Sequence, residues 1–208
     1  MVGVRDYLKP RIQDWMMKWM DNLREEAVAP AEGDVLEIGF GTGLNLPYYG
    51  PRVRSLTGLD PMVTTGLTKI ESRIEAAPFP VKRTALRADE RLPFDDAQFD
   101  SIVTTWTLCS IPDLPRALAE MRRVLKPGGQ YVFIEHGRSP NVATAKWQDR
   151  LNPAWRWMAD GCNINRPIER IVAESGFTLE QTHRFKGKGP SIASYLYRGI
   201  ARRSPTGG

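Results

Sequence analysis

The sequence predicts an α/β protein built on a doubly wound, mostly parallel sheet of seven strands. Short apolar runs rich in β-branched residues, which are typical of strands, alternate with segments of helical periodicity. The first run, residues 35–38, leads directly into a turn with glycine at positions 39, 41 and 43. In such sheets ligands bind beyond the carboxyl ends of the strands, so this turn is the first candidate for a binding site.

Composition is ordinary for one globular domain. The 208 residues are 41% apolar and 25% charged. No apolar run approaches the roughly 18 residues that a membrane span requires, and Arg5, Asp6 and Lys9 stand where a signal peptide would be apolar. We therefore expect a cytoplasmic protein.

Charge and cysteine content limit the partners. The net charge of +5 is modest and no block of five like charges occurs, so no nucleic-acid partner is expected, although basic residues gather near both ends. Cys109 and Cys162 are too few for a disulfide scaffold or a structural zinc site, and we expect no metal.

The chain begins with a predicted amphipathic helix. Apolar residues recur at helical spacing between positions 12 and 27, and Trp15 and Trp19 belong to this face. Packing of the helix on the core is one interpretation. A lid over an apolar substrate pocket, or a weak contact with a lipid surface, is the other.

The remaining elements follow from periodicity and from glycine and proline positions. Further strands are expected at residues 53–59, 81–86, 99–105, 131–134, 177–185 and 194–200. Helices are expected at residues 61–77, 114–125 and 168–175, with a helical insert near residues 140–165.

The glycine turn has the pattern E-x-G-x-G-x-G, from Glu37 to Gly43. Glycines lack the Cβ atoms that keep a ligand away from the backbone. The dinucleotide fingerprint G-x-G-x-x-G does not fit, because Leu44 and Leu46 occupy the places of its third glycine. Asp60 ends the second predicted strand about 20 residues later, where a carboxylate accepts hydrogen bonds from the two hydroxyls of a ribose. Without Asp60 the pattern would fit an ordinary glycine-rich turn equally well.

Four features in this order resemble the class I methyltransferases that use S-adenosylmethionine, whose fold is Rossmann-like. They are the glycine turn, Asp60, the segment Leu92-Pro93-Phe94, and the run from Arg123 to Gly129 ahead of an apolar strand. The resemblance implies S-adenosylmethionine as cofactor, with Glu37 toward its ammonium group and the segment at Ala88 and Asp89 beside its adenine. The implied cofactor-binding residues are Glu37, Gly39, Gly41, Gly43, Asn45, Asp60, Pro61, Ala88, Asp89, Thr105 and Cys109.

The resemblance also implies how the single domain is divided. Residues 1–30 would form a helical lid, residues 31–136 the cofactor-binding core and residues 137–167 a helical cap. Residues 168–208 would add a helix and a strand hairpin that ends in the antiparallel last strand of the sheet.

The segment after the fifth predicted strand carries a finer resemblance. Glu135-His136, Trp147-Gln148 and Asp160-Gly161-Cys162-Asn163, with Leu108-Cys109-Ser110 upstream, are similar to the small alkyl-thiol methyltransferases of the methyltransferase type 11-like group. The likeness runs from about residue 35 to 177 and implies a small thiol as methyl acceptor. Those proteins begin with an apolar membrane anchor, whereas this chain begins with a charged amphipathic helix. Related enzymes act on phospholipid amines, quinones and other small metabolites, so these acceptors remain alternatives.

Methyl transfer from a sulfonium is an in-line displacement that requires alignment and exclusion of water. His136 is the candidate base for a thiol acceptor, and Asp160 the second candidate catalytic residue; a purely structural role is the alternative for both. The expected substrate-binding residues are Trp15, Trp19, Trp106, Trp147, Trp155, Asn163 and Arg166. A non-enzyme alternative, a cofactor-binding module associated with RNA, lacks a basic stripe interleaved with aromatic residues.

Overall fold

The computed structural model describes residues 21–61, 68–159 and 161–204. The predicted N-terminal helix lies for the most part outside these residues. Its last turns are described as α2 (Asp21–Val28), which ends before Pro30.

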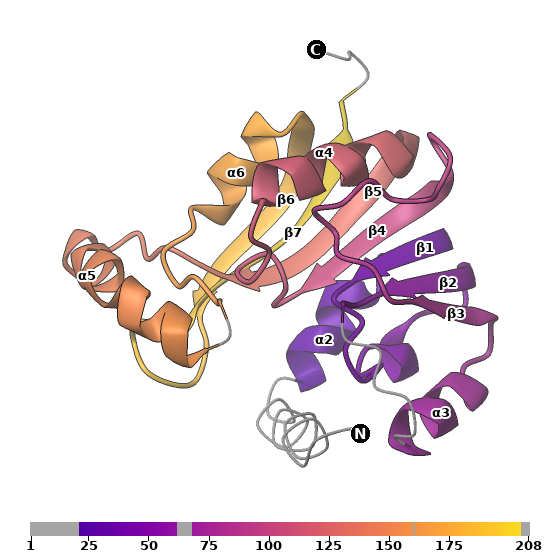
Figure 1. Ribbon diagram of the computed structural model, residues 1–208, viewed down its shortest axis with the longest axis horizontal. Coiled ribbons are helices and arrows are strands. Elements are labelled where there is room, and N and C mark those ends of the chain that lie inside the picture. Colours follow the sequence, from indigo (N-terminus) through magenta and orange to yellow (C-terminus); the bar gives the residue numbers. More distant parts are fainter. Residues whose placement is uncertain (1–20, 62–67, 160, 205–208) are drawn as a thin grey trace.

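A seven-stranded sheet forms the centre of the molecule, in the order β3-β2-β1-β4-β5-β7-β6 (Figure 1). β1 through β5 run parallel, and β7 pairs antiparallel with both β5 and β6. The predicted Rossmann-like topology with an antiparallel last strand is therefore confirmed. The strands are β1 (Gly33–Ile38), β2 (Val53–Leu59), β3 (Val81–Thr84), β4 (Phe99–Thr105), β5 (Leu125–His136), β6 (Phe177–Lys186) and β7 (Tyr195–Arg203).

The bounds of β2 and β4 match the prediction, whereas those of the other five strands differ from it by one to six residues. β3 ends at Thr84 rather than at residue 86. β5 begins at Leu125 and includes Pro127 and both following glycines, which the sequence predicts as a turn before the strand. Its register with β4 shifts between the pairs Phe99–Leu125 and Ser101–Gln130, so the glycines form an irregularity within the strand.

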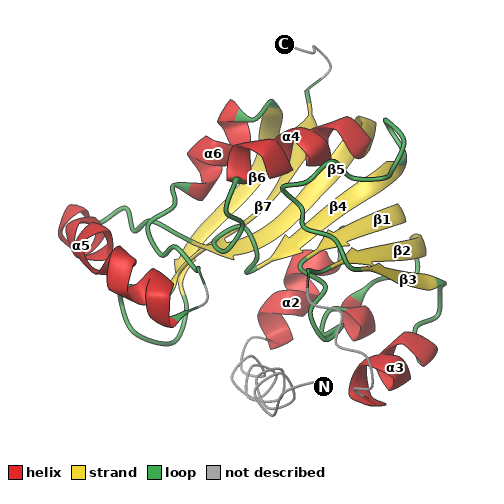
Figure 2. Cartoon of the chain, in the orientation of Figure 1, coloured by secondary structure: helices red, strands yellow, loops and turns green. Residues whose placement is uncertain are grey.

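Helices cover both faces of the sheet (Figure 2). One face carries α4 (Leu114–Val124) and α6 (Ile168–Glu174); the other carries α2, α3 (Thr68–Glu75) and the 3-10 turn η2 (Leu46–Tyr48). α5 (Val142–Met158) follows β5 and stands apart, beyond the end of the sheet toward which β4 and β5 point. The side chain of Asn141 caps α5 by accepting a hydrogen bond from the amide of Thr144.

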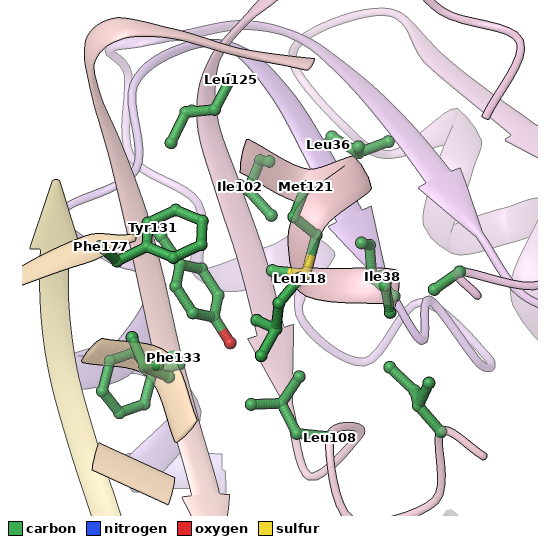
Figure 3. Packing of buried hydrophobic residues seen from close by; sticks show 14 of the residues in the cluster. Leu36, Ile38, Ile102, Leu108, Leu118, Met121, Leu125, Tyr131, Phe133 and Phe177 are labelled. Atoms are coloured by element: carbon green, nitrogen blue, oxygen red, sulfur yellow. The ribbon is translucent and has the colours of Figure 1, made fainter. Parts of the chain in front are cut away.

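Side chains alternate between two apolar clusters. Leu36 and Ile102 point toward α4, while Val35 and Val103 point toward α2 and α3. Figure 3 shows the α4 side, where the rings of Tyr131, Phe133 and Phe177 lie side by side. The Tyr131 ring centre is 5.3 Å from each of the other two. A fully buried side chain of this size stabilises the fold by about 1.5–3 kcal/mol, so this cluster fixes the sheet whose edge carries the site.

Within the described part of the chain, the structure contains no helix long and apolar enough to cross a membrane.

Candidate functional site

The order of the strands places the site. β2 and β3 lie on one side of β1, whereas β4 and β5 lie on the other, so the chain changes direction between β1 and β4. Connections leave in opposite directions at such a point and open a crevice at the carboxyl ends of the strands. The glycine turn follows β1, and Trp106 begins the loop that follows β4.

Hydrogen bonds join the glycine turn to the end of β2. The amides of Gly39 and Phe40 donate to the carbonyl oxygen of Leu59, at 2.8 and 3.0 Å. The amide of Gly41 donates to Oδ2 of Asp60 at 2.8 Å. The Asp60 carboxylate is therefore held at the rim of the turn.

Gly39 and Gly41 are required for different reasons. Both have positive φ angles, of 79° and 53°. A Cβ on Gly39 would come within 2.1 Å of Oγ1 of Thr107, so this glycine lets the loop after β4 approach the turn. A Cβ on Gly41 would meet nothing closer than the Gly39 carbonyl oxygen at 4.0 Å among the described residues. The space beside Gly41 is open for a ligand that lies against the backbone.

A buried polar network supports the turn from below. Asn45 Nδ2 donates to Oε1 of Glu37 at 2.8 Å, and the Tyr49 hydroxyl donates to Oε2 at 2.8 Å. Asn45 also donates to the Thr105 hydroxyl and accepts from Nη1 of Arg24. Glu37 is only 1% exposed, and burial raises its pKa to about 7. Asn45 and Tyr49 therefore hold the Glu37 carboxylate directly, while Thr105 and Arg24 hold Asn45.

Arg24 of α2 reaches the acceptor side of the crevice. Its guanidinium carbon lies 4.8 Å from the centre of the Trp106 ring, a cation–π distance. Trp106 has φ of 51°, a conformation that non-glycine residues rarely adopt. Such backbone conformations cluster at functional sites, which favours a role for Trp106 there.

The adenine candidates lie in a structured loop after β3. Oxygens of Asp89 accept hydrogen bonds from Arg87 at 2.8 and 3.0 Å and from the amide of Asp113. The hydrogen bonds from Arg87 hold the pKa of Asp89 below its usual value. Ala88 packs in the α4 side of the core. The proposed contact of Ala88 and Asp89 with adenine stays a prediction, as does that of the exposed Pro61.

Two cysteines and a histidine meet beyond β4 and β5. Sγ of Cys162 lies 3.1 Å from Nε2 of His136. Sγ of Cys109 completes a group whose ligand atoms all lie within 4.8 Å of one another. Trp155 donates from Nε1 to Sγ of Cys162 at 3.4 Å. The contacts with Cys109 and His136 lower the pKa of the Cys162 thiol, while the pKa of the buried Cys109 thiol is raised by Cys162 and by burial. We call Cys109, His136 and Cys162 the Cys-His-Cys cluster.

Asn163 and Arg166 hold the two cysteine loops together. The Asn163 backbone and side-chain amides both donate to the carbonyl oxygen of Cys109 at 2.9 Å. The Arg166 guanidinium donates to the carbonyl oxygens of Leu108 and Ile111. Both residues, expected to bind substrate, thus have defined positioning roles in the structure.

Glu135 anchors the same loop from β5. Its carboxylate accepts hydrogen bonds from the amides of Thr107 at 3.2 Å and Leu108 at 3.1 Å. Glu135 is fully buried, and desolvation raises its pKa to about 7. Leu108, also fully buried, fixes the loop to the core (Figure 3).

Most of the described site candidates lie at the carboxyl edge of the sheet, but Trp147 lies away from it. Trp147 is 52% exposed on α5, with the Arg150 guanidinium 5.7 Å from its ring centre, rather than in a pocket wall. Trp15, Trp19 and Asp160 lie outside the described residues.

The structure adds residues that the sequence analysis did not choose. Tyr49 donates a hydrogen bond to Glu37 of the glycine turn, and Arg24 donates to Asn45, which also holds Glu37. Glu135 holds the loop after β4, and Cys162 contacts His136. Glu135 and Cys162 carried a sequence signal, because both stand in the segments that resemble the alkyl-thiol methyltransferases. The roles of Arg24 and Tyr49 depend on contacts between distant segments.

Comparison with known proteins agrees with this geometry. Residues 36–133 match the family model described as a methyltransferase domain. The chain is 34% identical over 157 residues to phosphatidylethanolamine N-methyltransferase of Cereibacter sphaeroides, covering 72% of this chain and 73% of that protein. It is 34% identical over 159 residues to human thiol S-methyltransferase TMT1A, covering 76% of this chain and 65% of the human protein. A structure of N-methyltransferase NodS from Bradyrhizobium japonicum with S-adenosyl-L-homocysteine superposes with a TM-score of 0.66 at 18% identity, over 91% of each chain.

The chain therefore belongs to the class I methyltransferases, which take their methyl group from S-adenosylmethionine. Among the curated relatives, the human thiol methyltransferase and the bacterial phosphatidylethanolamine methyltransferase match at the same 34% identity. The matches show that the chain carries a domain of the S-adenosylmethionine-dependent methyltransferases, and they leave the acceptor open. The chain spans less than two thirds of the length of the human thiol methyltransferase that it matches.

The described residues fit that cofactor. Open space beside Gly41 admits a ligand against the backbone, and the Asp60 carboxylate stands at the rim where ribose hydroxyls are bound in this fold.

Proposed function

We propose that this chain transfers the methyl group of S-adenosylmethionine to a small thiol. The observation that supports it best is the path of the loop after β4. Thr107 in this loop contacts Gly39 of the glycine turn, and Cys109 belongs to the Cys-His-Cys cluster. The loop thus links the cofactor cradle to a buried sulfur- and imidazole-lined region suited to a thiol. The names of the mammalian relatives agree, although this chain spans only 65% of the human one.

Each side of the crevice has its own task in this proposal. Asp60 binds the ribose hydroxyls, and the buried Glu37 carboxylate favours the cationic methionine end of the cofactor. The bound cofactor supplies an electrophilic methyl group on a sulfonium. Two tryptophans limit the access of water to the acceptor. Trp106 lies against the Arg24 guanidinium, and Trp155 donates a hydrogen bond to Cys162. The acceptor loses its thiol proton before the transfer, because the thiolate is the nucleophile.

An acceptor panel tests the proposal. The purified chain is incubated with methyl-labelled cofactor and, separately, a small alkyl thiol, a primary amine, a phenol and phosphatidylethanolamine vesicles. Label is expected in the thioether, at a rate well above that of a reaction without protein. Transfer to the amine or the phospholipid with none to the thiol would remove the thiol assignment.

The exposed surface of α5 favours a second candidate, a phospholipid amine. Val142, Trp157 and Met158 are 69%, 86% and 67% exposed, and basic Arg150 and Arg156 are exposed on the same helix. A helix with exposed aromatic, apolar and basic side chains is typical of contact with a lipid surface. The bacterial phosphatidylethanolamine methyltransferase relative agrees with it.

The variant Trp157→Glu separates the two acceptors. If the acceptor is a lipid, this change is expected to weaken vesicle binding and slow transfer to phosphatidylethanolamine, because a carboxylate replaces an aromatic anchor. Transfer to a water-soluble thiol should not change. Sedimentation with phosphatidylglycerol-containing vesicles measures the first effect, and equal sedimentation of both proteins would contradict a lipid-binding role for α5.

A further inference from the structure

The Cys-His-Cys cluster brings together three side chains that can each bind a metal ion. Its three side chains come from separate parts of the chain: the loop after β4, the end of β5 and the loop after α5. Cys109 and His136 are 2% and 9% exposed. Both cysteines are free thiols. Nδ1 of His136 is buried and has no hydrogen-bond partner among the described residues.

These atoms are spaced as the ligands of one tetrahedral ion would be. Zinc binds cysteine sulfur at about 2.3 Å and histidine nitrogen at about 2.0–2.1 Å, which places neighbouring ligand atoms roughly 3.5–3.8 Å apart. All three candidate atoms lie within 4.8 Å of one another, and Sγ of Cys162 is 3.1 Å from Nε2 of His136. Small side-chain rotations would therefore admit the ion.

The ligand types and the charge also favour zinc. Thiolate and imidazole are the ligands that zinc prefers, and three protein ligands with one open position are characteristic of a catalytic zinc site. Two thiolates cancel the two charges of the ion. An occupied site would be formally neutral, which reduces the cost of its burial.

The surrounding residues hold the ligands in place before any ion binds. Asn163 donates two hydrogen bonds to the backbone of Cys109 and one, at 2.9 Å, to the carbonyl oxygen of Gly161, next to Cys162. Its own Oδ1 accepts from Asn152 of α5 at 3.1 Å. The Trp155 indole donates to the Cys162 sulfur, as hydrogen-bond donors beside metal thiolates do. The two cysteine loops are thus fixed relative to each other.

We propose that Cys109, His136 and Cys162 bind a zinc ion through Sγ, Nε2 and Sγ, and that the acceptor thiol occupies its fourth coordination position. The proposal rests on the thiol-methyltransferase function above and specifies how the thiol is activated. The acceptor R–SH displaces a water ligand and releases its proton to solvent, leaving R–S⁻ on the ion. The thiolate electron pair then forms the new S–CH3 bond while the methyl–sulfonium bond breaks, and the resulting thioether, a weak ligand, dissociates.

The first test is binding of the metal alone. The reduced, metal-free chain is titrated with Co²⁺, which reports tetrahedral thiolate ligation through its absorption, and the cobalt is then displaced with Zn²⁺. One Co²⁺ per chain is expected, with sulfur-to-metal charge-transfer bands and intense ligand-field bands that Zn²⁺ abolishes. Absence of these bands from a chain with two titratable thiols would overturn the proposal.

Single substitutions assign the ligands. Cys109→Ser, Cys162→Ser and His136→Gln are each expected to weaken Co²⁺ binding by more than about 100-fold, since loss even of an outer partner costs 10–100-fold. His183→Gln is the matched control, because His183 is the second histidine of the chain and lies exposed on β6. Circular dichroism and thermal unfolding show whether each variant is folded. Folded ligand variants that bind Co²⁺ like the unmodified chain would refute the assignment.

Activity measurements separate this proposal from the thiol function. Removal of zinc by a chelator should abolish thiol methylation while S-adenosylmethionine affinity is retained, and added Zn²⁺ should restore it. Full thiol methylation by the zinc-free chain would overturn the metal role and leave the thiol function standing. Cys109→Ser distinguishes the metal from a direct base, since it removes a ligand and retains His136; unchanged thiol turnover in this variant would overturn the metal role.

Discussion

The two sides of the crevice are built in different ways. The cofactor side is assembled mainly from residues close in sequence: amides of the glycine turn donate to the carbonyl oxygen of Leu59 and to the Asp60 carboxylate. The acceptor side is assembled from loops far apart in sequence, joined by side chains such as Asn163 and Arg166. The cofactor side therefore depends mainly on local geometry, whereas the acceptor side depends on contacts between distant segments.

The largest effect that distinguishes the two sides is expected at Asp60. Asp60→Ala removes the acceptor of two ribose hydroxyl hydrogen bonds, and at about 1.5–3 kcal/mol for each bond to a charged group, cofactor affinity should fall more than about 100-fold. Calorimetric titration with S-adenosylmethionine measures the loss. Asp95→Ala, which changes an exposed aspartate, is the control. An affinity within twofold of the unmodified protein would exclude the ribose contact.

A second comparison uses two glycines of the same turn. Gly39→Ala introduces a Cβ 2.1 Å from the Thr107 hydroxyl at a positive φ, whereas Gly41→Ala meets only the positive φ. The conformation alone costs about 1–2 kcal/mol, and the steric conflict adds to it at Gly39. We expect thermal unfolding without cofactor to show the larger loss of stability for Gly39→Ala. Gly41→Ala should instead mainly weaken cofactor binding, and the reverse order of stabilities would show that the loop after β4 moves away easily.

The same contrast explains what the sequence predicts well. The positions of the glycine turn, of Asp60 and of the strands follow from contiguous patterns, because strand periodicity and glycine spacing are local properties. The start of β5 was predicted too late, because its pairing with β4 continues through Pro127 and two glycines. Pairing with the neighbouring strand β4, rather than the local preference of these residues, therefore decides where β5 begins.

The acceptor side was predicted as a set of residues and not as an arrangement. The structure brings Cys109, His136 and Arg166 together near the carboxyl edge, and the roles predicted for them stay predictions. The contact of His136 with Cys162 does not follow from the sequence. Nor does the use of Arg166 to hold backbone carbonyls. Hydrogen bonds between loops depend on the whole fold, and no local pattern encodes them.

A substitution at Asn163 tests whether contacts between distant loops build the acceptor side. Asn163→Ala removes three side-chain hydrogen bonds, to Cys109, Gly161 and Asn152, which contribute about 1 kcal/mol each. We expect thiol methylation to fall about tenfold in kcat/KM, because misplaced loops reduce alignment of the acceptor. Cofactor affinity by calorimetry should be unchanged. Equal losses in both measurements would show that the two sides are not separable.

The smallest expected effect is the release of protons when the cofactor binds, which distinguishes the two buried acids Glu37 and Glu135. Burial raises the pKa of Glu37 to about 7 from its ordinary 4.5, so the cofactor-free protein gains stability from this group at low pH and loses it as pH rises from about 4.5 to 7. A cationic ligand favours the ionised form, so its binding near pH 6 should release a fraction of a proton. Calorimetry at pH 6 in buffers of different ionisation enthalpy measures this release.

Glu37→Gln should abolish the proton release and retain a hydrogen-bond acceptor for Tyr49. Glu135→Gln is the matched control, because burial raises the pKa of Glu135 to about 7 as well, on the acceptor side. If Glu37 senses the cofactor, proton release persists in Glu135→Gln. Loss of release in Glu135→Gln but not in Glu37→Gln would assign the charge of the bound cofactor to the acceptor side, and the division between the two halves of the crevice would then be wrong.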